Sequence, residues 1–211
     1  RSFHVTGVQT CALPISGGNI TGVTFGVGAS GFGGKWVQLL HELVPKVSHI
    51  AVLANSGSPL TAQLLADIRT AAQSLNVKID VVQAGNAAQL DAAFAAIGSS
   101  PAQALIVSSD PFFVSNRARI TQFAATRRLP AVYFTKLFAD EGGLMAYGAS
   151  LEDSYRRAAT TVDKILKGAA PADLPIEQPT TFQLTINMRA ASALGLSVPR
   201  LLLLRADHVI K

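Results

Sequence analysis

Three glycines near the start of the chain have the spacing of a nucleotide-binding loop. Gly26, Gly28 and Gly31 stand in G-x-G-x-x-G register, after a β-branched stretch and before a helical pattern. In dinucleotide-binding folds such a loop holds a pyrophosphate, and an acidic residue at the end of the next strand holds the ribose. That strand ends instead in Asn55 and Ser56. These glycines, with Gly33 and Gly34 after them, therefore favour a flexible connection. A nucleotide-dependent Rossmann-like enzyme that uses the loop of Gly26, Gly28 and Gly31 is kept as an alternative.

The other reactive side chains form no catalytic set. Each histidine stands apart in the sequence from any nucleophile or second metal ligand. These histidines are His4, His41, His49 and His208. The sequence also contains no zinc-type ligand spacing, no Walker loop and no G-x-S-x-G elbow. We therefore predict a protein without catalytic residues, metal or cofactor.

The first sixteen residues differ from the remainder of the chain. They include the only cysteine, Cys11, and residues 5–15 resemble the translation of a common sequencing adapter. A segment of this kind is excluded from fold reasoning, so segment 1–16 is treated as an artefact. We expect the natural chain to begin upstream, where a signal peptide would have been lost. Without Cys11 the chain has no thiol chemistry.

Composition narrows the class of protein. Half of the residues are hydrophobic (49%) and few are charged (15%), which is typical of a globular chain. The net charge of +5 comes from scattered Lys and Arg, paired only at 127–128 and 156–157. This pattern argues against nucleic acid as a partner, because no basic stripe is interleaved with aromatic residues.

Short apolar runs alternate with longer helical periods along most of the chain. Strands are predicted at 49–55, 77–82, 103–109 and 130–134, and helices at 60–75, 87–97 and 117–128. A further strand at 142–148, a long helix at 151–168, a proline-rich connector, a strand at 181–187 and a short helix follow. This alternation predicts an α/β fold with a parallel βαβ sheet. Ligands of such sheets bind at the carboxyl ends of the strands.

Polar and aromatic residues gather at that predicted edge. They are Asn55 and Ser56 after the first strand, Ser108, Ser109 and Asp110 after the third, and Tyr133, Phe134 and Thr135 at the fourth. This mixture suits a small polar or zwitterionic ligand. Helix capping is the alternative, because Asp110 precedes Pro111 and Ser58 precedes Pro59. Both interpretations stay open.

Several blocks of the sequence resemble the substrate-binding proteins of ABC transporters, in the group that includes tryptophan-type binding proteins. The blocks are "GGNITGVTF", "GGKWVQLLHELVPKVSHIAVLANSGSP", "LPAVYFTKLFADEGGLMAYG", "YRRAATTVDKILKGAAPADLPIEQPTTFQLTINMRAASALGLSVP" and "LLLRADHVI". The resemblance runs from Gly17 to Lys211. It implies a type I periplasmic-binding-protein-like fold, in which two α/β lobes hold the ligand in a cleft between them.

The resemblance also implies a division of the chain. Segment 17–34 would be the inter-lobe crossing, 35–142 and 178–211 the C-terminal α/β lobe, and 143–177 the remnant of the N-terminal lobe with its connector. Most of that N-terminal lobe is expected to be missing. The implied ligand-binding residues are Asn55, Ser56, Ser109, Asp110, Tyr133 and Phe134. The implied hinge residues are Thr21, Gly22, Tyr147 and Gly148.

The predicted function is that of the solute-binding component of an ABC importer. It would bind a small molecule such as an amino acid by hinge closure, without catalysis, and pass it to an ABC permease in the membrane. The expected location is periplasmic or extracytoplasmic. The string "ANSGSP" stands where relatives often have a Tyr-Asn-Pro-Ser type string, so the ligand stays open. The ligand-sensing domain of a regulator has the same fold and is a further alternative.

Overall fold

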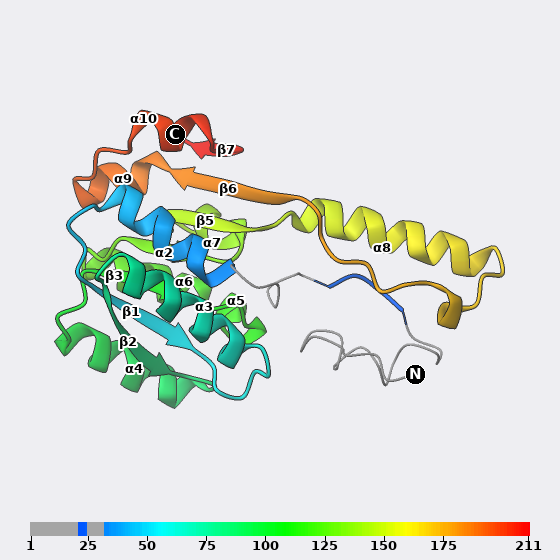
Figure 1. Ribbon diagram of the computed structural model, residues 1–211, viewed down its shortest axis with the longest axis horizontal. Helices are drawn as coiled ribbons and strands as arrows, with labels where there is room; N and C mark the ends of the chain where they lie inside the picture. The colour runs from blue at the N-terminus through cyan, green and yellow to red at the C-terminus, as the bar shows by residue number, and fades with distance from the viewer. Residues whose placement is uncertain (1–20, 25–31) are drawn as a thin grey trace. The chain divides into compact units, whose positions relative to one another are not determined.

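The alternation of apolar runs and helical periods folds into a mostly parallel sheet flanked by helices. The computed structural model describes residues 21–24 and 32–211 (Figure 1). The described residues divide into two compact units: unit 1 comprises 21–24 and 149–182, and unit 2 comprises 32–148 and 183–211. The glycines of the G-x-G-x-x-G register lie outside the described residues.

Seven strands form one sheet in the order β2-β1-β3-β4-β5-β6-β7. The strands are β1 (His49–Ala54), β2 (Lys78–Gln83), β3 (Ala104–Val107), β4 (Ala131–Tyr133), β5 (Met145–Ala149), β6 (Phe182–Asn187) and β7 (His208–Ile210). Pairing is parallel from β2 through β5 and again between β6 and β7. The backbone N–H of Asn187 donates to the carbonyl of Leu144 at 2.8 Å, so β6 ends where β5 begins. These two strands therefore run in opposite directions.

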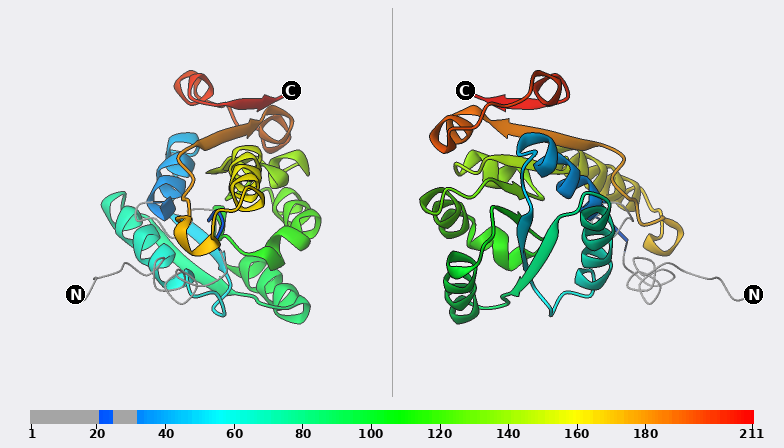
Figure 2. Two further views of the ribbon diagram at one scale, coloured as in Figure 1. Left: turned by 90° about the vertical axis from the view of Figure 1, so that its right-hand side faces the viewer. Right: turned by 60° about the vertical axis from the view of Figure 1, so that its left-hand side comes forward.

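Helices alternate with the strands, and those of unit 2 cover both faces of the sheet. The helices are α2 (Phe32–Leu43), α3 (Thr61–Ser74), α4 (Ala87–Ser99), α5 (Pro111–Ser115), α6 (Arg117–Thr126), α7 (Lys136–Asp140), α8 (Leu151–Leu166), α9 (Met188–Leu194) and α10 (Arg200–Leu204), with a 3-10 turn at Pro171–Asp173. Figure 2 shows the blue and cyan helices α2 and α3 on one side of the sheet and the green helices on the other. The α/β prediction is confirmed.

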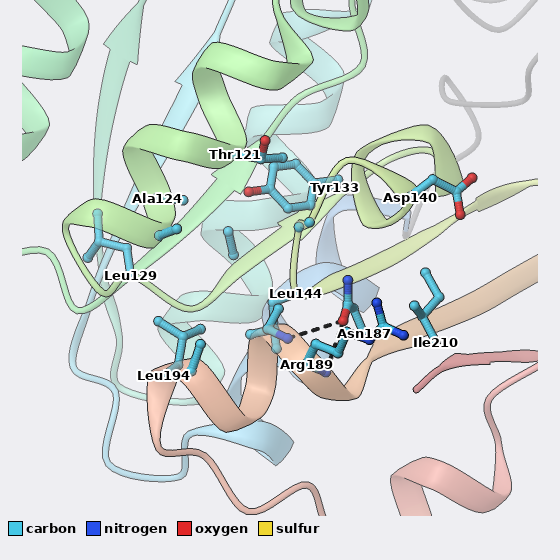
Figure 3. A pocket seen from close by; sticks show the side chains of 16 residues that line it. Thr121, Ala124, Leu129, Tyr133, Asp140, Leu144, Asn187, Arg189, Leu194 and Ile210 are labelled. Carbon is cyan, nitrogen blue, oxygen red and sulfur yellow. Dashed lines mark hydrogen bonds between the residues drawn. The ribbon is translucent and has the colours of Figure 1, made fainter.

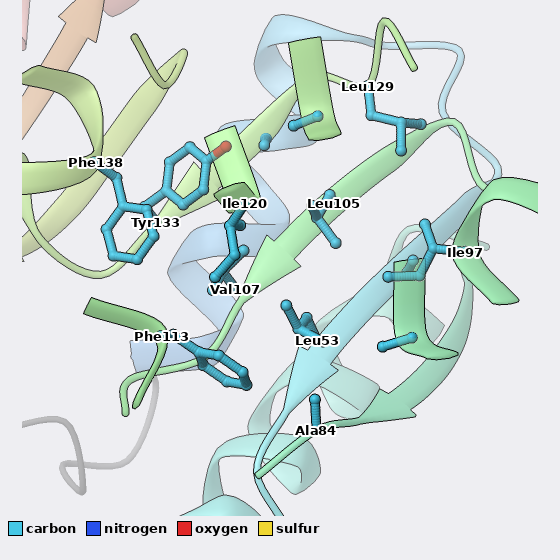
Figure 4. Packing of buried hydrophobic residues seen from close by; sticks show 14 of the residues in the cluster. Leu53, Ala84, Ile97, Leu105, Val107, Phe113, Ile120, Leu129, Tyr133 and Phe138 are labelled. Atoms are coloured by element: carbon cyan, nitrogen blue, oxygen red, sulfur yellow. The ribbon is translucent and has the colours of Figure 1, made fainter. Parts of the chain in front are cut away.

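The core lies between the strands and the green helices. Leu53 from β1, Leu105 and Val107 from β3, and Phe113 and Ile120 from α5 and α6 are fully buried there (Figure 4). Ile50, Val52 and Ile106 are equally buried and belong to the opposite face of their strands. Because β1 and β3 are covered on both faces, they read in the sequence as continuous apolar runs.

Local signals set the ends of several helices. The side chain of Asn86 accepts from the backbone N–H of Gln89 at 3.0 Å, which caps α4. The side-chain oxygen of Gln89 accepts in turn from the backbone N–H of Gly85 at 2.8 Å. In the usual capping box the donor is one residue later, at the N-cap itself. Helix α9 ends at Gly195, whose φ of 71° lies in the left-handed region.

The glycine pair at the start of α2 differs from its prediction as a flexible connection. Helix α2 begins at Phe32, so Gly33 and Gly34 are helical. A Cβ on Gly33 would lie 2.7 Å from a side-chain carbon of Ile68 and 2.8 Å from the carbonyl oxygen of Leu64. Gly33 therefore lets α2 pack closely against α3, and this packing explains the residue better than backbone flexibility does.

Unit 1 contains α8 and a paired stretch of backbone. Glu177 donates its N–H to the carbonyl of Gly22 at 3.0 Å, and Thr24 donates to the carbonyl of Glu177 at 2.9 Å. The guanidinium of Arg157 on α8 donates to Asp153 at 3.0 Å and to the hydroxyl of Thr180 at 2.7 Å. Segment 21–24 is thus tied to the connector that follows α8. The division between the units falls after Gly148, and β5 pairs with β4 inside unit 2.

The close packing at Gly33 gives a test with a matched control in the same helix. Gly33→Ala should lower the free energy of unfolding by about 1–3 kcal/mol, because the added methyl overpacks the contact with α3. Gly34→Ala should raise it by about 0.5–1 kcal/mol through helix propensity, since its Cβ would be 3.4 Å from the nearest atom. Urea unfolding followed by the fluorescence of Trp36 measures both. Equal effects of the two substitutions would contradict the packing argument.

Candidate functional site

The carboxyl edge of the sheet is organised by a hydrogen bond between Asn55 and Asp110. Asn55 follows β1 and donates its Nδ2 to Oδ2 of Asp110, after β3, at 2.9 Å. The other carboxylate oxygen accepts from the backbone N–H of Phe112 at 2.8 Å. The strand ends that topology predicts to be neighbours therefore do bring these two side chains together.

Asn55 is held from several directions. Its Oδ1 accepts from the N–H of Gly57 at 3.0 Å, and its backbone carbonyl accepts from the hydroxyl of Thr61 at 2.6 Å. A Cβ on Gly85, which follows β2, would stand 2.9 Å from Oδ1 of Asn55. Gly85 was not identified from the sequence, although its position between a strand and the cap Asn86 is a signal of such a close approach.

The capping alternative is correct for Asp110 and wrong for Ser58. Asp110 is the N-cap of α5, with extended backbone and Pro111 in the first turn. Helix α3 instead has Leu60 at its N-cap, without a side-chain bond. Capping uses one oxygen of the Asp110 carboxylate and the bond from Asn55 uses the other. A carboxylate has about four lone-pair positions, so acceptor capacity is left for a ligand.

Hydroxyl groups lie at the ends of β3 and β4. Ser108 and Thr135 are buried, and their hydroxyls have no hydrogen-bond partner in the described part of the chain. Ser109 is half-buried and Ser56 is exposed. The half-buried ring of Phe134 lies 5.7 Å from the ring of Phe138. Buried hydroxyls without partners are uncommon, which makes this edge a candidate for ligand contact.

Tyr133 is the last residue of β4 and pairs with Val107 at the carboxyl edge, but its side chain belongs to the hydrophobic core. Its side chain is 0% exposed, and its ring stacks on Phe138 at 4.6 Å between centroids. Burial raises the pKa of the Tyr133 phenol well above its usual range. Tyr133 therefore belongs to the core beneath α6 and α7.

The predicted hinge residues occupy two different environments. In unit 1, the hydroxyl of Thr21 donates to the carbonyl of Leu174 at 3.0 Å, and a Cβ on Gly22 would have open space. In unit 2, the carbonyl of Tyr147 accepts from the indole N–H of Trp36 at 2.8 Å. A Cβ on Gly148 would lie 1.7 Å from the carbonyl oxygen of Phe134, so only glycine fits there.

The described residues contain neither a candidate metal site nor a candidate membrane-spanning helix. Within residues 21–24 and 32–211, no group of three or more His, Cys, Asp or Glu side chains could hold a metal ion. In the same described ranges, no helix combines the length and the apolar character that crossing a membrane requires.

The sequence as a whole matches one protein family. A family described as "ABC transporter substrate binding protein" matches residues 8–210. The chain belongs to this family. By that description, its members are the substrate-binding proteins of ABC transporters. No curated protein sequence matches the chain.

Solved structures of the same fold support the architecture. An ABC domain from Streptococcus pneumoniae in complex with L-Trp has a TM-score of 0.79 at 22% identity, covering 92% of this chain and 66% of that one. A conserved domain protein from Vibrio cholerae has a TM-score of 0.76 at 23% identity, covering 85% and 60%. A periplasmic solute binding protein from Actinobacillus succinogenes with bound D-allose has a TM-score of 0.60 at 14% identity, covering 87% and 66%. The chain thus spans less than two thirds of each structure.

The bond between Asn55 and Asp110 can be measured by a double-mutant cycle. Asn55→Ala, Asp110→Ala and the double variant should give a coupling energy of about 1–2 kcal/mol, because the bond involves a buried carboxylate. The pair Lys136–Asp140, whose side chains are both more than 40% exposed, is the matched control. Its coupling should stay below about 1 kcal/mol. Urea unfolding of the wild-type protein and the six variants measures both values, and equal couplings would contradict the organising role of the Asn55 bond.

The two hinge glycines should respond differently to the same substitution. Gly148→Ala should lower the free energy of unfolding by about 3 kcal/mol or more, because the backbone of β4 must move to accept the methyl. Gly22→Ala should change it by less than about 0.5 kcal/mol, because nothing lies within 4 Å of the new atom. Thermal unfolding followed by circular dichroism compares them. A tolerated Gly148→Ala would mean that β5 is not tightly held.

Proposed function

We propose that this substrate-binding protein captures a small zwitterionic molecule such as an amino acid at the carboxyl edge of its sheet. The observation that carries the proposal is the Asn55–Asp110 pair, which holds a buried carboxylate at the topological position of ligand sites in α/β sheets. A ligand ammonium group would bind to the free lone pairs of Asp110. Because that side chain is fixed by two bonds, little entropy would be lost on binding.

The neighbouring groups are suited to the rest of such a ligand. Ser108 and Ser109 come after β3, and Thr135 comes after β4. Their hydroxyls would donate to a ligand carboxylate. The half-exposed ring of Phe134 supplies an apolar surface for a side chain. The pneumococcal structure binds L-Trp, and this supports L-tryptophan as the first ligand to test.

Transport would follow from closure of two lobes around the ligand. In this proposal the hinge residues are Thr21, Gly22, Tyr147 and Gly148, and the closed form is presented to an ABC permease. The location would be periplasmic or extracytoplasmic, as is typical of the family. The contacts that tie segment 21–24 to Glu177 support a hinge whose crossing segments move together.

Calorimetric titration against the amino acids, with L-tryptophan first and D-allose as the sugar comparison, tests the proposal. Saturable binding of an amino acid is expected, and Asp110→Asn should weaken it at least tenfold, about 1.4 kcal/mol, by removing the charge. That variant keeps an oxygen for capping, so the fold should persist. Asn55→Ala should weaken binding as well.

Asp91→Asn is the matched control for charge. Asp91 is exposed and pairs with Arg119 on the helical face of the unit. Its substitution should leave the affinity unchanged. Binding of D-allose alone, or of no amino acid, would contradict the proposed ligand class. Binding of the amino acid by Asp110→Asn with the affinity of the wild-type protein would contradict it as well.

A further inference from the structure

A cavity whose lining includes neither Asn55 nor Asp110 lies within unit 2. It has a volume of about 390 Å³. It is lined mainly by small and branched apolar side chains, including Ala124, Leu129, Leu144, Leu194 and Ile210 (Figure 3). The volume falls in the range of small-molecule sites, about 300–1,000 Å³. We call it the Tyr133 cavity, after the aromatic side chain in its wall.

The elements around the Tyr133 cavity show where it lies in unit 2. Ala131 is the first residue of β4, and Leu144 directly precedes β5. Helix α6 contributes from its C-terminal part and helix α9 along its length. The site proposed for the amino acid lies at the carboxyl ends of β1 and β3. The two sites are therefore separate, and a ligand in one does not occupy the other.

The polar groups that line the cavity differ in how well they are satisfied. The hydroxyl of Thr121 donates within its own helix, to the carbonyl of Arg117 at 3.0 Å. The side chain of Asn187 donates to the carbonyl of Ala139 at 3.0 Å and caps α9. The hydroxyl of Tyr133 is buried and has no hydrogen-bond partner in the described ranges. It is the group in this wall that a ligand could satisfy.

We propose that the Tyr133 cavity binds a small, uncharged and largely apolar molecule that carries one hydroxyl or carbonyl group. The apolar walls favour burial of a ring or a branched chain. The phenol would hydrogen-bond to the single polar group, because a buried tyrosine hydroxyl normally has a partner. Charge is disfavoured beside the buried phenol, because the lining is mainly apolar. The charged residues of the lining, Asp140 and Arg189, are both exposed. Asp140, at the edge of the cavity, is already paired with Lys136.

The matched probes p-cresol and toluene test the proposal, because they differ only by a hydroxyl group. Titrations of the whole chain are followed by NMR at the signals of Leu144, Leu194 and Ile210. The wild-type protein should bind p-cresol at least about threefold more tightly than toluene. Tyr133→Phe should remove this preference, and it should fold well, because it deletes a buried hydroxyl that lacks a partner.

A filling substitution supplies the second arm. Ala190→Leu extends a half-buried residue of α9 into the cavity and should abolish p-cresol binding. Ala95→Leu, on an exposed position of α4, is the control and should leave it unchanged. A cavity filled only by water would give no saturable binding of p-cresol. The absence of saturable binding would overturn the proposal. An unchanged preference of Tyr133→Phe for p-cresol over toluene, or p-cresol binding that survives Ala190→Leu, would overturn it as well.

Discussion

The burial of two parallel strands, β1 and β3, governs the rest of this structure. Every residue of β3, and all of β1 after His49, is buried. Inside such a sheet each backbone N–H and C=O must be paired within the ladder, because no water reaches it. Helices must then cover both faces. Polar side chains that bind anything can occur only where the strands end.

The same constraint explains why fold and candidate site share residues. At the end of β3 the chain must turn into α5, and the N-cap Asp110 satisfies the N–H of Phe112. Its second oxygen fixes Asn55, at the end of β1. Capping and ligand binding are therefore compatible roles for Asp110. A residue that must be fixed for the helix to begin is already oriented for a ligand, which lowers the entropy lost on binding.

Much of the fold could be predicted from the sequence because its signals are local. The apolar runs at 49–54 and 104–107 and the cap at Asn86 each depend on neighbouring residues. The position of Asn55 and Asp110 at one edge was also predicted, since parallel topology brings those strand ends together, but their hydrogen bond was not. The face of a strand on which a side chain lies was harder to predict. β4 is only three residues long, and its period-two pattern does not say which face Tyr133 joins. The role of Gly33 depends on α3, which is distant in the sequence, so no local pattern could reveal it.

The positions where the chain could bend follow from what holds each hinge residue. Tyr147 is anchored by the indole of Trp36, and Gly148 lies against the carbonyl of Phe134, so both stay with the sheet. Gly22 is bonded to Glu177 and stays with unit 1. In the proposed hinge motion, dihedral change would therefore be concentrated just after Gly148, where the tight contact ends. A close contact on one side of a hinge localises the bending, because only the residues beyond the contact are free to rotate.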